Sequence, residues 1–168
     1  ERRLKQRLPL LMFMENYSDG HRHAESAVPT GMAYLDLDAL GGEDPRKVWE
    51  RLRTLIVSKE LDELIVLVHV SCSGKGLRIV YIIPRQFNHL SPTEQIDQSK
   101  QWLAGQLGVE DDSKTKDLAR GSFAVPRDYI LYGPDKQMWS LTPNPSNSLT
   151  PNPSPKGEGN GNSQGQSK

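Results

Sequence analysis

The strongest constraint on the fold comes from two apolar, β-branched-rich runs, Leu64–Val70 and Leu77–Ile83, which are separated only by Ser71–Gly76. Runs of this kind are typical of strands that are buried on both faces. The connection is too short for a crossover helix, and its glycines suit a turn. The two runs therefore predict an antiparallel hairpin within a sheet.

A third strand is predicted over 32–38, where apolar and polar residues alternate. Successive side chains of a strand point to opposite faces, so one face carries Ala33, Leu35 and Leu37 and the other carries Tyr34, Asp36 and Asp38. The pattern predicts a strand with one buried side.

Helix signals follow two of these strands. Asp44 and Pro45 suit the N-cap and first position of a helix that continues to about Ser58. A second helix begins with a capping box at Ser91 and ends at Gly108. With short strands at about 120–125 and 129–132, the order of elements predicts an α+β fold, a mainly antiparallel sheet with two helices on one face.

The end of the chain has a different composition. From Leu141 it is mostly Pro, Gly, Asn and Ser, and it repeats the hexamer Leu141–Ser146 at Leu149–Ser154. Such a segment buries too little apolar surface to offset the entropy of ordering the chain. We therefore predict a folded domain over 1–139 and a disordered tail over 140–168. Because the chain starts at Glu1, we expect the domain to be truncated at its N-terminus.

Composition limits the partners, the location and the kind of binding site that can be expected. No apolar run approaches the roughly 20 residues of a membrane span, so no membrane partner is expected. The single cysteine, Cys72, excludes an internal disulfide and fits a reducing, cytoplasmic location. Lys and Arg number 21 and so do Asp and Glu, so any phosphate binding needs a local basic site.

The first candidate for chemistry is the pair Asp36 and Asp38. Two carboxylates on one face of a strand repel each other, and a shared hard cation such as Mg²⁺ or Mn²⁺ relieves the repulsion. The competing interpretation is a solvated strand face with two ordinary surface aspartates.

The second candidate is the turn Ser71–Gly76 with Arg78. Its glycines let backbone N–H groups turn toward an anion, while Ser, Lys and Arg side chains add donors and charge. The turn is not a P-loop, because no Ser or Thr follows Lys75 and a strand follows in place of a helix. The alternative is a hairpin turn whose glycines only satisfy backbone angles.

A weaker third candidate is Asp112, which is followed by Arg120 and Phe123. A two-cation site needs a third carboxylate, because two aspartates only partly neutralise two divalent ions. Asp111 and Asp117 compete for this role.

Taken in order, these features resemble the archaeo-eukaryotic primase-polymerase superfamily, and more closely the VirE N-terminal domain family of bacterial mobile-element proteins. The resemblance covers about 4–132. It rests on the acidic strand Tyr34–Asp38, the Ser-x-Ser-Gly-x-Gly-Leu hairpin that leads into the strand ending at Ile83, and the spacing of Asp112, Arg120 and Phe123.

The resemblance implies a palm-like, RRM-like fold and a metal-dependent nucleotidyltransferase in a mobile-element replication protein. The residues implied to hold Mg²⁺ or Mn²⁺ and to be catalytic are Asp36, Asp38 and Asp112. Those implied to bind the nucleoside triphosphate are Ser71, Ser73, Gly74, Lys75, Gly76, Arg78 and Arg120. DNA and a helicase domain or partner are the further partners implied.

One departure from the family pattern leaves open whether the domain is catalytically active. Many active primase-polymerases have His where this chain has Arg78, and arginine cannot donate a proton near neutral pH. The alternative is a catalytically inactive or truncated relic of the same fold that binds nucleic acid. A third hypothesis is an unrelated α/β domain with surface aspartates.

Overall fold

The computed structural model describes residues 9–17, 27–38, 40–110 and 121–133. All of them belong to the first of two units into which the chain divides, Glu1–Lys136 and Gln137–Lys168. The predicted tail, 140–168, lies outside the described residues. The elements in chain order are β1 (Leu10–Leu11), β2 (Glu15–Tyr17), β3 (Ala27–Pro29), β4 (Met32–Leu37), α2 (Pro45–Ser58), η2 (Asp62–Leu64), β5 (Ile65–Val70), β6 (Leu77–Ile82), η3 (Arg85–Phe87), α3 (Pro92–Leu107), β7 (Ser122–Phe123), η4 (Arg127–Tyr129) and β8 (Ile130–Tyr132).

The main sheet has four antiparallel strands in the order β4-β6-β5-β8. The predicted hairpin is formed by β5 and β6, which pair from Val70 and Leu77 outward. Strand β4 pairs along its whole length with β6, so that Asp36 faces Arg78 and Leu37 faces Leu77. The predicted α+β class with a mainly antiparallel sheet is confirmed.

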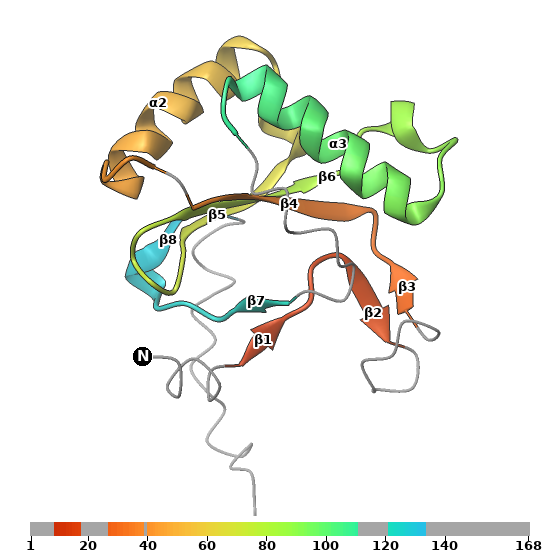
Figure 1. Ribbon diagram of the computed structural model, residues 1–168, viewed down its shortest axis with the longest axis horizontal. Coiled ribbons are helices and arrows are strands. Elements are labelled where there is room, and N and C mark those ends of the chain that lie inside the picture. Colours follow the sequence, from red (N-terminus) through yellow and green to blue (C-terminus); the bar gives the residue numbers. More distant parts are fainter. Residues whose placement is uncertain (1–8, 18–26, 39, 111–120, 134–168) are drawn as a thin grey trace, which may run out of the picture. The chain divides into compact units, whose positions relative to one another are not determined.

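Helices α2 and α3 lie together on one face of this sheet, as predicted (Figure 1). The Asp44 side chain caps α2 by accepting a 2.9 Å hydrogen bond from the Arg46 amide. At the start of α3 the Ser91 amide donates to Glu94, and Gly108 ends the helix with a left-handed φ of 63°. The buried side chains that the helices turn toward the sheet are Val48, Trp49, Leu52, Ile56, Ile96, Leu103, Ala104 and Leu107. None of the helices in the described ranges is both long and apolar enough to cross a membrane.

The opposite face of the sheet is covered by two short strand pairs. Strand β1 pairs with β7, and β2 pairs with β3; both pairs lie across the sheet from the helices (Figure 1). The strand predicted near 120–125 therefore exists as β7 but joins β1 in a separate sheet. Sequence patterns do not show this pairing, because strands this short carry little periodic signal.

This cover changes the environment of β4. The sequence predicted one buried side, yet Tyr34 and Asp36 on the polar face are as buried as Leu35 on the apolar one, with 0%, 2% and 0% of their surface exposed. Alternation predicts which side chains share a face, but it does not show whether another layer covers that face. Asp36 is therefore not an ordinary surface aspartate.

Candidate functional site

The buried polar face of the sheet centres on an ion pair between Asp36 and Arg78. The two residues are register partners on β4 and β6, so their side chains stand next to each other on one face. The Arg78 Nη2 donates to one carboxylate oxygen of Asp36, and Nε lies 3.4 Å from the other. Only 12% of the Arg78 side chain and 3% of the Asp36 side chain are exposed. The guanidinium thus faces both oxygens of the carboxylate in a largely buried pair.

The ring of Tyr34 lies against the same guanidinium. The Arg78 guanidinium carbon is 4.3 Å from the ring centroid, within the range of a cation–π contact. The Lys100 Nζ, which comes from α3, is 5.7 Å from the same centroid. Arg78 is therefore held between a carboxylate and an aromatic face.

His69 continues this row onto β5, where it is the register partner of Arg78. Its Nδ1 donates to the Val70 carbonyl at 2.8 Å, because a carbonyl oxygen can only accept. Its Nε2 lies 3.4 Å from the Ser122 hydroxyl of β7. Burial lowers the pKa of His69, and the nearby positive charge of Arg78 lowers it further. The imidazole is therefore a neutral, hydrogen-bonded link between the main sheet and the β1–β7 pair.

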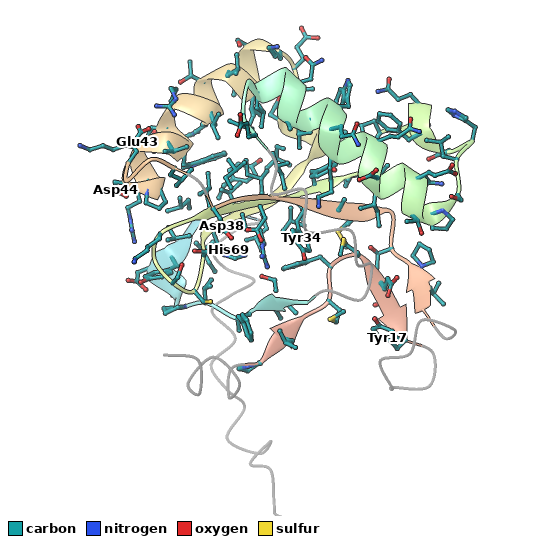
Figure 2. The ribbon with its side chains drawn as sticks, viewed as in Figure 1. Tyr17, Tyr34, Asp38, Glu43, Asp44 and His69 are labelled. Carbon is teal, nitrogen blue, oxygen red and sulfur yellow. The ribbon has the colours of Figure 1, made fainter. Side chains whose placement is uncertain are left out.

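Asp38 occupies a different position from Asp36. It follows the end of β4 and is exposed, at the mouth of the β5–β6 turn (Figure 2). A Cβ atom on Gly76 would lie only 2.6 Å from the Asp38 Oδ1. The carboxylate of Asp38 therefore occupies space that is open only because residue 76 is glycine.

The Ser71–Gly76 turn is closed by its own hydrogen bonds. The Ser71 amide donates to the Gly76 carbonyl, and the Gly74 amide donates to the Ser71 carbonyl, both at 2.8 Å. The Ser71 hydroxyl accepts from the Gly76 amide at 3.0 Å and shares a 2.9 Å hydrogen bond with Ser73. Three amides of the turn, those of Ser71, Gly74 and Gly76, therefore donate inside the turn, while the Lys75 side chain is exposed.

The tip of the turn has a neighbour that the sequence patterns did not reveal. A Cβ on Gly74 would lie 3.4 Å from the Tyr129 hydroxyl. The Arg46 guanidinium carbon lies 5.7 Å from the centroid of the Tyr129 ring, and the Arg46 Nη2 donates to the Asp128 carbonyl at 3.0 Å. The first turn of α2 and the η4 segment are thereby joined beside the hairpin.

The predicted site residues fall into three groups. Asp38 lies with Ser71, Ser73, Gly74, Lys75 and Gly76 at the turn, whereas Asp36 and Arg78 form the buried pair beside it. Asp112 and Arg120 lie outside the described residues. Across 9–17, 27–38, 40–110 and 121–133, no three His, Cys, Asp or Glu side chains lie close enough together to hold a metal ion.

Three residues of this region were missed or set aside by sequence reasoning. Tyr34 was used only to define a strand face, and His69 was treated only as part of the apolar run Leu64–Val70, whereas the structure shows it buried and hydrogen-bonded. Ser122 carried no signal of its own. The register of β4, β5 and β6 places the first two beside Arg78. The β5–β6 hairpin could have predicted the position of His69, but no short turn joins β4 to β6, so the position of Tyr34 could not be predicted in this way.

The comparison with protein families gives one result. A model described as BT4734-like, N-terminal domain, matches residues 3–131. The chain belongs to this family. No curated protein and no solved structure matches the chain.

Membership of the BT4734-like N-terminal domain family corrects the resemblance drawn from the motifs. The assignment to the VirE N-terminal domain family was wrong. The acidic strand and the Ser-Gly hairpin are short, and residues of these types recur wherever a strand pair needs a polar end and a tight turn. The BT4734-like match covers nearly all of the described domain and therefore outweighs these short motifs.

Proposed function

We propose that this BT4734-like domain binds a nucleoside triphosphate together with Mg²⁺ or Mn²⁺, and that it transfers a nucleotidyl group. The observation that carries the proposal is the position of Asp38, whose carboxylate lies against Gly76 beside the Ser71 hydroxyl. An exposed carboxylate next to a serine- and glycine-containing turn with an exposed lysine offers one ligand for a hard cation and several donors for phosphate oxygens.

The proposed chemistry follows from these groups. The cation supplies charge that neutralises the phosphates and the leaving pyrophosphate. Asp38 holds that cation, while Lys75 and the Ser73 hydroxyl contact phosphate oxygens. An attacking hydroxyl forms a bond to the α-phosphorus and loses its proton to solvent, while the bond between the α-phosphorus and the oxygen that bridges it to the β-phosphorus breaks. Pyrophosphate leaves with the electron pair of that bond. Asp112 and Arg120 remain predicted members of this site.

The sharpest test uses Gly76→Ala, which adds one methyl group and removes no donor or acceptor. The methyl group would lie 2.6 Å from the Asp38 Oδ1 and 3.0 Å from the Leu37 carbonyl oxygen, so the carboxylate has to move. We expect the Mn²⁺-dependent affinity for a nucleoside triphosphate to fall at least about tenfold, or about 1.4 kcal/mol. Isothermal titration calorimetry measures it.

The control is Gly105→Ala in α3, where a Cβ meets nothing within 4 Å. This variant should bind as the unmodified chain does. Asp38→Asn should abolish the Mn²⁺-dependent part of the binding. Undiminished binding by Asp38→Asn, in a variant that remains folded by circular dichroism, would exclude the proposal.

A second candidate is a binding module without catalysis. The buried Asp36–Arg78 pair favours it, because a carboxylate already neutralised by arginine is a poor ligand for a catalytic cation. Template-dependent incorporation of a labelled nucleotide by the purified protein would exclude this candidate. Salt-sensitive DNA binding without incorporation would support it.

The expectations about partners, biological role and location stay predictions. They are a DNA partner, a helicase domain or partner, a role in the replication of a mobile element, and a cytoplasmic location. A salt-titrated DNA-binding assay is the most direct test of the first, because phosphate contacts weaken steeply as salt rises.

A further inference from the structure

A cavity of about 210 Å³ lies between the end of β4, the first half of α2 and the residues that follow α3. We propose that this cavity takes a guanine base, so that the domain prefers guanosine triphosphate to the other nucleoside triphosphates. The proposal rests on the proposed function, because it names the base of the nucleotide that the turn is proposed to bind.

The size and the walls of the cavity suit a single ring system. Four aliphatic residues line it: Leu37, Leu40, Val48 and Val109. Pockets for drug-sized ligands have volumes of about 300–1,000 Å³, so this smaller cavity suits a base and leaves the sugar and the phosphates outside. Apolar walls favour the faces of a planar heterocycle, because contact removes apolar surface from water.

Two sides of the cavity are fixed by backbone hydrogen bonds. In the loop before α2, the Glu43 amide donates to the Leu40 carbonyl at 3.0 Å. After α3, the Val109 amide donates to the Ala104 carbonyl at 3.0 Å, next to the left-handed Gly108. The cavity is therefore largely formed before a ligand arrives, which lowers the entropy cost of binding.

The polar groups of the cavity favour a flat ligand that carries N–H donors. The Arg51 Nη1 donates to both carboxylate oxygens of Glu43, at 2.9 and 3.2 Å, and a guanidinium held in this way can stack on a ring. Glu110 also lines the cavity and is exposed, and its carboxylate can only accept hydrogen bonds. Guanine is the common base that offers two adjacent donors, N1–H and the N2 amino group, to one carboxylate.

The cavity adjoins the turn Ser71–Gly76 at the end of β4. Leu37, the last residue of that strand, lines the cavity, and its carbonyl oxygen lies 3.0 Å from the position of a Cβ on Gly76. Leu37 is also the register partner of Leu77, which follows the turn directly. Only the end of one strand separates the two places, so a single nucleotide can contact both.

Isothermal titration calorimetry in the presence of Mn²⁺, with non-hydrolysable analogues of GTP and ATP, tests the preference. The unmodified chain should bind the GTP analogue at least about tenfold more tightly, because a good bidentate contact to a base edge discriminates by about that factor or more. Glu110→Gln replaces one acceptor oxygen by a donor and should remove the preference. Glu63→Gln, at an exposed position outside the cavity, is the matched control and should keep it.

Guanosine without phosphates separates this inference from the proposed function. The unmodified chain should bind guanosine in the absence of Mn²⁺ in an NMR titration, and Val109→Trp, which fills the cavity, should not. Guanosine binding by a chain that binds no triphosphate would overturn the proposed function and support the cavity as a base site.

Equal affinity for the two analogues, unchanged in Glu110→Gln, would overturn the guanine site and leave the proposed function intact. Binding of neither guanosine nor a triphosphate would overturn both. If Val109→Trp does not fold, Glu110→Gln decides, because position 110 is exposed and the substitution keeps the size of the side chain.

Discussion

At the scale of single residues, the main feature of the domain is a buried ion pair in which each charge has its partner. Asp36, Arg78 and His69 stand in one row across three strands, and the Ser122 hydroxyl closes the row from β7. Buried ionic groups stabilise a fold only if each has its partner, because an unpaired charge keeps its full desolvation cost. Single and paired substitutions should therefore have very different effects.

Replacing Arg78 alone should be severe. Arg78→Met leaves the Asp36 carboxylate buried without its cation, and we expect the free energy of unfolding to fall by about 3–5 kcal/mol. Urea unfolding measures the change. In the double variant Asp36→Leu/Arg78→Met both charges are gone and most of the loss should be recovered; a double variant as unstable as the single one would contradict this account.

His69 should make stability depend on pH. Its pKa in the folded state lies below its ordinary value of 6.5, chiefly because it is buried, so the folded protein binds fewer protons than the unfolded chain. The contribution of neutral His69 to the free energy of unfolding is fully present above pH 6.5 and is lost as the pH falls below that value. The slope from this one group reaches at most about 1.4 kcal/mol per pH unit.

Urea unfolding between pH 7.5 and pH 5 tests this prediction. His69→Gln should flatten the dependence, while His89→Gln, at an exposed position, serves as the matched control. Equal slopes in the unmodified chain and in His69→Gln would assign the pH dependence to other groups.

At the scale of elements, α3 offers two glycines with opposite requirements. Gly105 lies within the helix, is exposed, and has nothing within 4 Å of a Cβ position. Gly108 ends the helix with a left-handed φ of 63°, where an L side chain is strained. The same substitution should therefore change stability in opposite directions three residues apart.

We expect Gly105→Ala to raise the free energy of unfolding by about 0.5–1 kcal/mol, because alanine loses less entropy in a helix. Gly108→Ala should lower it by about 1 kcal/mol. Thermal and urea unfolding of both variants provide the measurement. A shift in the same direction for both would mean that the helix end is not fixed by the left-handed residue.

At the scale of the whole molecule, composition predicts that 140–168 does not contribute to the fold. The family match ends at residue 131, before this segment begins. A chain that ends at residue 139 should therefore unfold at the same temperature as the full chain, as measured by differential scanning calorimetry. A lower unfolding temperature would show that the segment packs on the domain.

Sequence patterns predicted the larger elements of the fold and only part of the site. The hairpin, the strand at 32–38 and both helices carry strong periodicity and caps, and all are present. The short strands β1, β2, β3 and β7 do not, because two or three residues contain too few alternations to be recognised. For the same reason the burial of Asp36 was not predicted, since these short strands cover the polar face of the main sheet.

The pairing of β1 with β7 has a consequence for how the domain forms on the ribosome. Leu10 and Leu11 are made early, whereas their partners Ser122 and Phe123 emerge near the end of the domain. The hairpin and both helices can therefore assemble first, with water still reaching Asp36 and Arg78. The pairing of β1 with β7, which helps to cover these two residues, is a late step because it joins the two ends of the domain. A stalled or shortened nascent chain would therefore carry a hydrated, weakened ion pair at its centre.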